Sequence, residues 1–226
     1  MVIITKSFKF FIKGLLVFFI LLNFPTTIFA YETYSEAMKW YEESHSLIDP
    51  KKNYFIGLKL ENDGNKKKAL TFFRLAADSG LKEAQIKVGF YLIKSENPEE
   101  QKEARGIFKL LSDKENAIAS FKLGWMYENG IGGEKNFHKA SQFYKLAASR
   151  DQYNAYLYLA NLSLADPNNT NILLAASYST IAMKRSVRGA DILLDKLLPL
   201  LKNDEIDEIE VLVSSLESEI QKFKTN

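Results

Sequence analysis

Apolar residues fall at helical spacing along most of this 226-residue chain. Five segments begin with an alanine and carry mostly apolar or small residues three, four, seven and eight positions later, which is one face of an α-helix. In the segment ALTFFRLAADSG, residues 69–80, these positions hold Phe72, Phe73, Ala76 and Ala77. The pattern predicts helices that pack through one face.

The segments recur at a nearly constant interval. Their leading alanines are Ala37, Ala69, Ala104, Ala140 and Ala175. A small residue recurs between them, at Gly57, Gly89, Gly124 and Ala160. Two sets of small residues that share one irregular spacing indicate a repeat of about 35 residues containing two helices. We expect the small residues to let neighbouring helices approach closely, while an aromatic ring from the adjacent helix fills the remaining space.

Polar residues mark the expected starts of the alanine-led helices. Four residues before the leading alanine stand Thr33, Asn65, Asn136 and Asn171. Such side chains accept hydrogen bonds from the free N–H groups of a first turn, so we expect them to be N-caps. The segment led by Ala104 has Glu100 at this position, and its helix is expected to start earlier, at Asn97-Pro98.

The most regular unit is ASFKLGWMYENGIGGEKNFHKASQFYKLAASRD, residues 119–151. It resembles the Sel-one-like repeat, a relative of the tetratricopeptide repeat, in these positions: Leu123-Gly124, Tyr127, Gly130, Gly132 and Lys139-Ala140. Because one helix pair cannot bury its own apolar face, several pairs must stack. We therefore expect an all-α fold, a right-handed αα-superhelix (solenoid) of stacked helix-turn-helix repeats over residues 31–190. The resemblance implies that residues 191–226 form C-terminal capping helices.

The first thirty residues have a different pattern. Three lysines precede a short apolar run, residues 14–22, and Pro25 lies before the small residue Ala30. We expect a signal peptide over residues 1–30 that is cleaved after Ala30, so that the chain is exported. An uncleaved membrane anchor is the alternative, but the apolar run is about half of the roughly 20 residues that a spanning helix needs.

Charge and composition exclude several partners. Without residues 1–30 the chain has 27 basic and 28 acidic residues, a net charge of −1. Because nucleic-acid binding uses broad basic surfaces, we expect no nucleic-acid partner. We also expect no membrane insertion after the signal peptide is cleaved. The chain has no cysteine, which excludes disulfides, thiol catalysis and zinc–cysteine sites.

Three short patterns resemble chemical motifs without meeting their requirements. The glycine-rich segment 128–136 lacks the Lys-Ser/Thr ending of a nucleotide loop, so we expect a connector between helices. Ser79 and Lys82 have the Ser-x-x-Lys spacing of penicillin-recognising enzymes, but the companion Ser-Asp-Asn and Lys-Thr-Gly elements are absent. The two histidines, His45 and His138, lack the spacing of a metal-binding pair. We expect no catalytic residue, no metal site and no cofactor.

Recognition is the function that these exclusions favour. Stacked helix pairs present a concave face formed mainly by their first helices. On those helices the residue after the small position varies, and a lysine precedes it by one turn in two repeats, so the candidate binding residues are Phe90, Trp125, Asn161, Lys87 and Lys122. The alternative is that Phe90 and Trp125 only fill core space.

The resemblance implies a scaffold rather than an enzyme. Such a scaffold would bind a protein or peptide in the periplasm of a bacterium or outside its cell. The alternative function is a cell-wall-directed or β-lactamase-like hydrolase.

Overall fold

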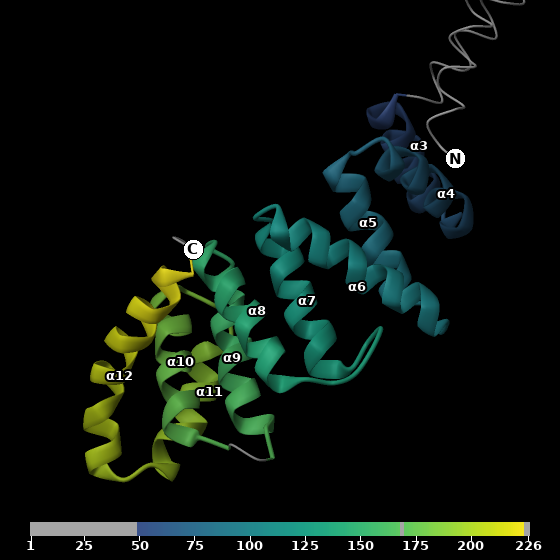
Figure 1. The fold of residues 1–226 in the computed structure, drawn as a ribbon. Coiled ribbons are helices and arrows are strands. Elements are labelled where there is room, and N and C mark those ends of the chain that lie inside the picture. Colours follow the sequence, from purple (N-terminus) through teal and green to yellow (C-terminus); the bar gives the residue numbers. More distant parts are fainter. Residues whose placement is uncertain (1–48, 168–169, 224–226) are drawn as a thin grey trace, which may run out of the picture. The chain divides into compact units, whose positions relative to one another are not determined.

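The computed structural model describes residues 49–167 and 170–223 of the chain. The expected signal peptide, the segment led by Ala37, and the side chains of Thr33 and His45 lie outside these residues. The described residues form α-helices and one short 3-10 helix, with no β-strand among them (Figure 1). None of these helices is both long and apolar enough to cross a lipid bilayer.

The helices form successive pairs, and each pair is one repeat. The first helices of the pairs are α3 (Pro50–Asn62), α5 (Lys82–Ile93), α7 (Ala117–Asn129) and α9 (Asn154–Ala165). The second helices are α4 (Lys66–Asp78), α6 (Pro98–Asp113), α8 (Phe137–Ser149) and α10 (Ile172–Lys184). Along the series each helix packs against the helix before it and the helix after it (Figure 1). This arrangement confirms the predicted all-helical solenoid of stacked helix-turn-helix repeats.

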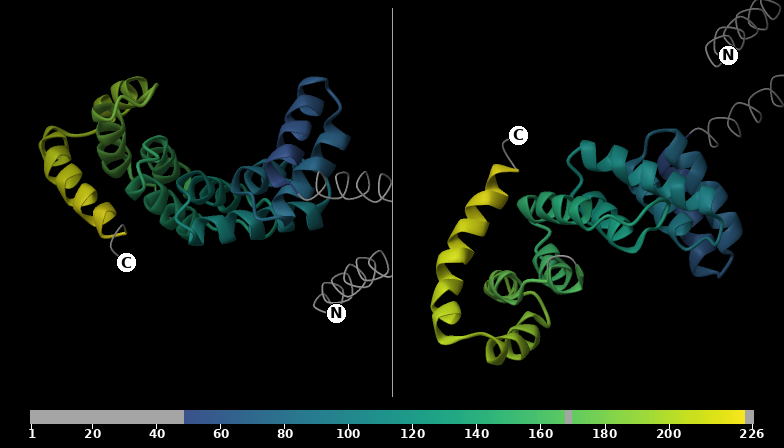
Figure 2. Two further views of the ribbon diagram at one scale, coloured as in Figure 1. Left: turned by 90° about the horizontal axis from the view of Figure 1, so that it is seen from above. Right: turned by 60° about the horizontal axis from the view of Figure 1, so that its bottom comes forward.

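Helical segments also follow the last repeat. They are α11 (Ala190–Leu197), the 3-10 helix η1 (Leu198–Leu200) and α12 (Asn203–Lys222). α11 packs against α10 as the first helix of a further repeat would, whereas α12 packs against both α10 and α8 (Figure 2). The buried face of α12 consists of Ile209, Val213, Leu216 and Ile220.

Glycines of three first helices lie directly against aromatic rings of the second helices. A Cβ atom built on each glycine would lie 2.6 to 2.7 Å from a ring carbon, closer than real Cβ contacts. The pairs are Gly57 with Phe73, Gly89 with Phe108, and Gly124 with Tyr144. All three rings are fully buried. The expected close packing of small residues against aromatic rings is therefore present in three consecutive repeats.

The fourth repeat has different residues at these two positions. Ala160 stands where the other repeats have glycine, and Ser179 stands where they have the buried ring. Both side chains are fully buried. This repeat therefore has a methyl group in place of the glycine hydrogen and a serine in place of the ring, and it lacks the glycine–ring contact of the other three.

The helix starts agree with the predicted caps at most positions. Asn136 and Asn171 each accept a hydrogen bond of 2.8 Å from the N–H three residues later. Asn97 accepts one of 2.9 Å from Glu99, and α6 begins at Pro98 as expected. The prediction for Asn65 is wrong in part, since α4 begins after it but its side chain makes no capping hydrogen bond. Its ψ of 62° departs from the extended cap conformation found at Asn136.

A polar contact joins the first helices of two successive repeats. The carboxylate of Glu61 at the end of α3 accepts hydrogen bonds from Lys87 Nζ at 2.6 Å and from the Tyr91 hydroxyl at 3.0 Å, both on α5. Burial alone would raise the pKa of Glu61, but the two hydrogen bonds and the charges of Lys87 and Lys94 hold this pKa below its usual value. Burial and the bond to Glu61 raise the pKa of Tyr91 to about 12. Glu61 is thus ionised at neutral pH.

The glycine–ring contact predicts opposite effects for two glycine-to-alanine substitutions. Gly89→Ala forces a Cβ against the Phe108 ring, and we expect a loss of about 1–3 kcal/mol in the free energy of unfolding. Gly106→Ala on the exposed face of α6 meets no atom within 4 Å, and we expect a gain of about 0.5–1 kcal/mol from helix propensity. Urea denaturation followed by circular dichroism measures both. Equal stabilisation by the two substitutions would contradict the close contact.

The Glu61 contact predicts a pH-dependent contribution to stability. Because the folded-state pKa is lowered, the contribution is complete above the unfolded-state value of about 4.3 and is lost as the pH falls through the lower folded-state value. We expect Glu61→Gln to cost about 1 kcal/mol at neutral pH and nothing in strong acid. Urea midpoints across the acid range measure this difference. Glu83→Gln removes a carboxylate that makes no ion pair with a described residue, and it should show no such trend.

Candidate functional site

The five predicted binding residues lie on first helices of three successive repeats. Lys87 and Phe90 are one turn apart on α5, Lys122 and Trp125 are one turn apart on α7, and Asn161 is on α9. In α5 and α7 the glycine between the lysine and the aromatic residue faces a buried ring of the next helix. The lysine and the aromatic residue are therefore directed to the border of that contact, where both side chains are partly exposed.

Three of these residues form one cluster of a cation and aromatic rings. The ammonium nitrogen of Lys122 lies 5.1 Å from the ring centroid of Phe90 and 5.8 Å from that of Trp125. The Phe121 ring, beside it on α7, is 5.6 Å away. These distances are within the range of cation–π attraction. The cluster connects α5 to α7 through side chains.

The Lys122 ammonium has no acidic partner within the part of the chain that the structure describes. Burial lowers the pKa of Lys122, and the positive charge of Lys94 lowers it further. Aromatic ring faces attract a cation but do not replace the strong hydrogen bonds that an ammonium makes to oxygen. The half-buried Lys122 ammonium can therefore donate a hydrogen bond to an oxygen atom of a bound partner.

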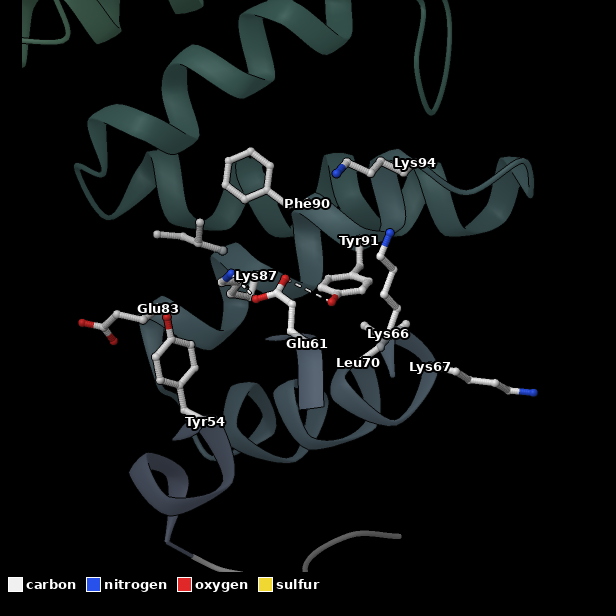
Figure 3. A pocket seen from close by; sticks show the side chains of 11 residues that line it. Tyr54, Glu61, Lys66, Lys67, Leu70, Glu83, Lys87, Phe90, Tyr91 and Lys94 are labelled. Atoms are coloured by element: carbon white, nitrogen blue, oxygen red, sulfur yellow. Dashed lines mark hydrogen bonds and ion pairs between the residues drawn. The ribbon is translucent and has the colours of Figure 1, made fainter. Parts of the chain in front are cut away.

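A hollow of about 780 Å³ adjoins the cluster between α3, α4 and α5 (Figure 3). Its apolar lining includes Leu70, Ile86 and the ring of Phe90. Its charged lining consists of Lys66, Lys67, Lys87, Lys94, Glu61 and Glu83. Figure 3 shows Glu61 at the centre, bonded to Lys87 and Tyr91, whereas the carboxylate of Glu83 points outward. The hollow therefore has four basic groups against two acidic groups, one of which is already engaged.

The aromatic residues of the cluster contribute to the core as well as to the surface. Phe90 makes an edge contact with the buried Phe108 ring, with centroids 5.7 Å apart. Trp125 packs against the two core clusters on either side of it. The core-filling alternative is thus part of their role, while their partial exposure leaves area for a partner.

Asn161 is not part of this arrangement. It is exposed on α9 and does not line the hollow. On the same side of the fold, α9 contributes Tyr158, whose ring packs on Phe121 at 4.7 Å and on Tyr144 at 5.4 Å. The structure therefore brings together Lys87, Phe90, Lys122 and Trp125 but not Asn161.

Sequence reasoning missed Glu61, Tyr91 and Lys94. One signal for Glu61 exists, because glutamate stands four residues after the packing glycine in two repeats, at Glu61 and Glu128. Each accepts a hydrogen bond from a tyrosine, at 2.5 Å from Tyr144 in the case of Glu128. Two recurring acidic residues in register indicate a structural hydrogen bond rather than a free carboxylate.

The glycine-rich connector serves the fold rather than a phosphate ligand. Gly130 ends α7 with a φ of 70°, and a side chain on Gly132 would collide with the backbone carbonyl of Gln101. Arg105 donates hydrogen bonds to the carbonyls of Met126 at 3.2 Å and of Ile131 at 2.9 Å. The connector thus presents carbonyl oxygens to a cation, the opposite of a phosphate-binding loop.

The remaining chemical candidates have ordinary structural partners. Ser79 ends α4 and donates its hydroxyl hydrogen to the carbonyl of Leu75 at 3.0 Å. His138 is exposed and lies 3.1 Å from the amide of Gln142. Within the described ranges no three histidine or acidic side chains are grouped so that they could hold a metal ion.

Comparison with known proteins identifies the repeats. A family model described as the Sel1 repeat matches residues 53–81 and 117–152, which lie in the α3–α4 and α7–α8 pairs. The second match includes nearly the whole of the most regular unit of the sequence. No curated protein sequence matches the chain.

Two solved structures share the fold. One is a protective antigen present in uropathogenic Escherichia coli strains that displays an SLR fold, with a TM-score of 0.65 and 19% identity. That alignment covers 82% of this chain and 42% of the antigen chain, so the present chain spans less than half of its length. The other is a Sel1 repeat protein from Oxalobacter formigenes, with a TM-score of 0.55 and 24% identity over 74% of this chain and 69% of that one. The chain thus contains matches to the Sel1 repeat at residues 53–81 and 117–152, and its described part shares the fold of these two Sel1-like repeat structures.

Proposed function

We propose that this chain is an exported scaffold, without catalytic activity of its own, that binds a protein or peptide segment through the face formed by its first helices. Sel1 repeats typically mediate protein interactions. The observation that carries the proposal is that the Lys122 ammonium lies against the partly exposed rings of Phe90 and Trp125 and has no acidic partner among the described residues. Aromatic anchors beside a polar group are typical of the residues that dominate protein interfaces.

The neighbouring hollow supports the same face. Its volume of about 780 Å³ is large enough for several side chains of a bound segment. Its apolar surface at Leu70, Ile86 and Phe90 would accept apolar side chains, while the surrounding lysines would fix their orientation. The scaffold is favoured over the hydrolase alternative because the Ser79 hydroxyl is bonded to the carbonyl of Leu75 and Ser79 does not line the hollow.

Export is supported by the sequence of residues 1–30. A positive leader, a short apolar run and a small residue before Tyr31 are the parts of a secretory signal. A cysteine-free chain that must fold outside the cytoplasm depends on burial alone, and the described repeats provide two core clusters, with Trp125 packed against both. We place the mature protein in the periplasm of a bacterium or outside its cell.

Binding should be visible at Trp125. Trp40→Phe leaves Trp125 as the remaining tryptophan, and we expect its emission to shift when a peptide selected from a random dodecapeptide library binds the full chain. Trp125→Ala should weaken that binding by at least about tenfold, since buried aromatic anchors contribute most of an interface energy. Val211→Ala, at a residue of α12 that is 74% exposed, should leave it unchanged. If the selected peptides bind Trp125→Ala and Val211→Ala with equal affinity, the proposed binding face is wrong.

Export should be visible at the amino terminus of the mature chain. We expect protein expressed in a Gram-negative bacterium to be recovered by osmotic shock or from the medium and to begin at Tyr31 when its N-terminus is sequenced. Ala30→Arg should block cleavage, because signal peptidase needs a small residue there. A wild-type chain that keeps residues 1–30 and stays in the membrane fraction would establish the anchor instead.

A further inference from the structure

The basic groups beside the aromatic cluster share one feature, which is the absence of acidic partners. Within the described residues neither Lys94, which directly follows α5, nor Lys122 on α7 forms an ion pair. Lys66 at the start of α4 is also unpaired and lines the same hollow. In contrast, Lys87 is committed to Glu61 at 2.6 Å. The free positive charge is therefore concentrated on either side of Phe90.

One of these cations lies against the Phe90 ring, and another lines the same hollow as that ring. Lys122 Nζ lies 5.1 Å from the centroid of Phe90, and the side chain of Lys94 extends on the Phe90 side of the hollow (Figure 3). Burial lowers the pKa of Lys122, and the positive charge of Lys94 lowers it further, so the two cations are close enough to interact. An anion placed between them would relieve this repulsion and provide the oxygen acceptor that the rings do not.

The remainder of the surface argues for a peptide rather than a nucleic acid. The mature chain is close to neutral, and the unpaired lysines lie next to the carboxylates of Glu61 and Glu83 instead of along an extended basic track. The apolar patch formed by Leu70, Ile86 and Phe90 suits an apolar side chain next to the anionic group. These properties complement a peptide in which acidic and apolar residues are neighbours.

We propose that the segment recognised by this face is an acidic peptide, with one carboxylate held between Lys94 and Lys122 beside Phe90 and an adjacent apolar side chain in the hollow against Leu70 and Ile86. This rests on the proposed function, because it names the chemistry of the partner that the first-helix face binds. Lys66 lines the same hollow, and its side chain extends from α4 toward Lys94 (Figure 3), so it is placed to meet a second acidic group of the same peptide.

The test is a selection from the random dodecapeptide library on the full chain, followed by affinity measurements. We expect glutamate and aspartate to be enriched next to apolar residues in the bound peptides. For a selected peptide, Lys122→Met and Lys94→Met should each weaken binding about tenfold, which is the loss of one charge-assisted hydrogen bond. Lys122→Arg should retain most of the affinity, and high salt should reduce it for the wild type.

Matched controls separate charge at this site from charge in general. Lys82→Met removes an exposed lysine from the first turn of α5 that does not line the hollow, and it should bind the peptide as the wild type does. Replacing the acidic residues of the peptide by their amides should weaken wild-type binding and leave Lys122→Met binding almost unchanged. Thermal unfolding of each variant confirms that the fold is intact.

The outcomes distinguish this inference from the proposed function. Peptides that bind through Trp125 but show no acidic enrichment, or whose affinity is unaffected by Lys122→Met and Lys94→Met, overturn the acidic-peptide inference alone. A library from which no peptide binds overturns both. The acidic-peptide inference is also overturned if a single-stranded oligonucleotide competes with the selected peptides and its binding depends on Lys94 and Lys122. The site would then recognise phosphate.

Discussion

The contact between a glycine of one helix and a buried aromatic ring of the next is the constraint on which the solenoid depends. At Gly57, Gly89 and Gly124 no Cβ fits, because a fully buried ring occupies that space. The absence of a side chain lets the two helices of a repeat approach closely, and the ring restores the packing density of the interior. Since the rings of Phe73 and Phe108 cannot move away without leaving a cavity, each contact fixes the position of its helix pair. The fourth repeat departs from this pattern, because Ala160 and Ser179 stand where the other repeats have the glycine and the ring.

The repeat interval and most helix starts of this fold could be predicted from the sequence, but the backbone path of an individual turn could not. The repeat interval, the small positions and the caps at Asn136 and Asn171 follow from residues close together in the chain. Asn65 has the same residue type and register, yet its backbone has a ψ of 62° and its side chain makes no capping bond. Its preceding turn is short, with Gly64 at a φ of 79°, and the path of that turn determines the cap. Composition alone does not specify such a path.

The candidate site divides in the same way. Phe90 and Trp125 could be picked out because they vary inside a regular frame, and Lys122 because a lysine recurs one turn before the small position's successor; the structure joins all three into one cluster. The role of Lys87 was not predictable, because its partner Glu61 is 26 residues away and belongs to the preceding repeat. Lys87 and Lys122 are equivalent in the repeat, yet their charges differ in surroundings. Lys87 forms an ion pair with Glu61, whereas no described carboxylate occupies the equivalent position beside Lys122. The position of a residue in the repeat determines where its Cα lies on the helix, whereas residues of the neighbouring repeat determine the charges around its side chain.

The packing constraint also explains why the recognition residues stand where they do. In an α-helix the next residue is rotated by about 100°, so a glycine that faces the ring of the following helix turns its successor to the edge of the interface. Phe90 and Trp125 are those successors, which is why each is partly buried in the core and partly exposed. The lysines three residues before them lie on the same side of the helix, within about 60° of the aromatic residue. In the second and third repeats a close-packed glycine therefore holds an aromatic residue and a lysine at the border of the core, rigid enough to be preorganised and open enough to meet a partner.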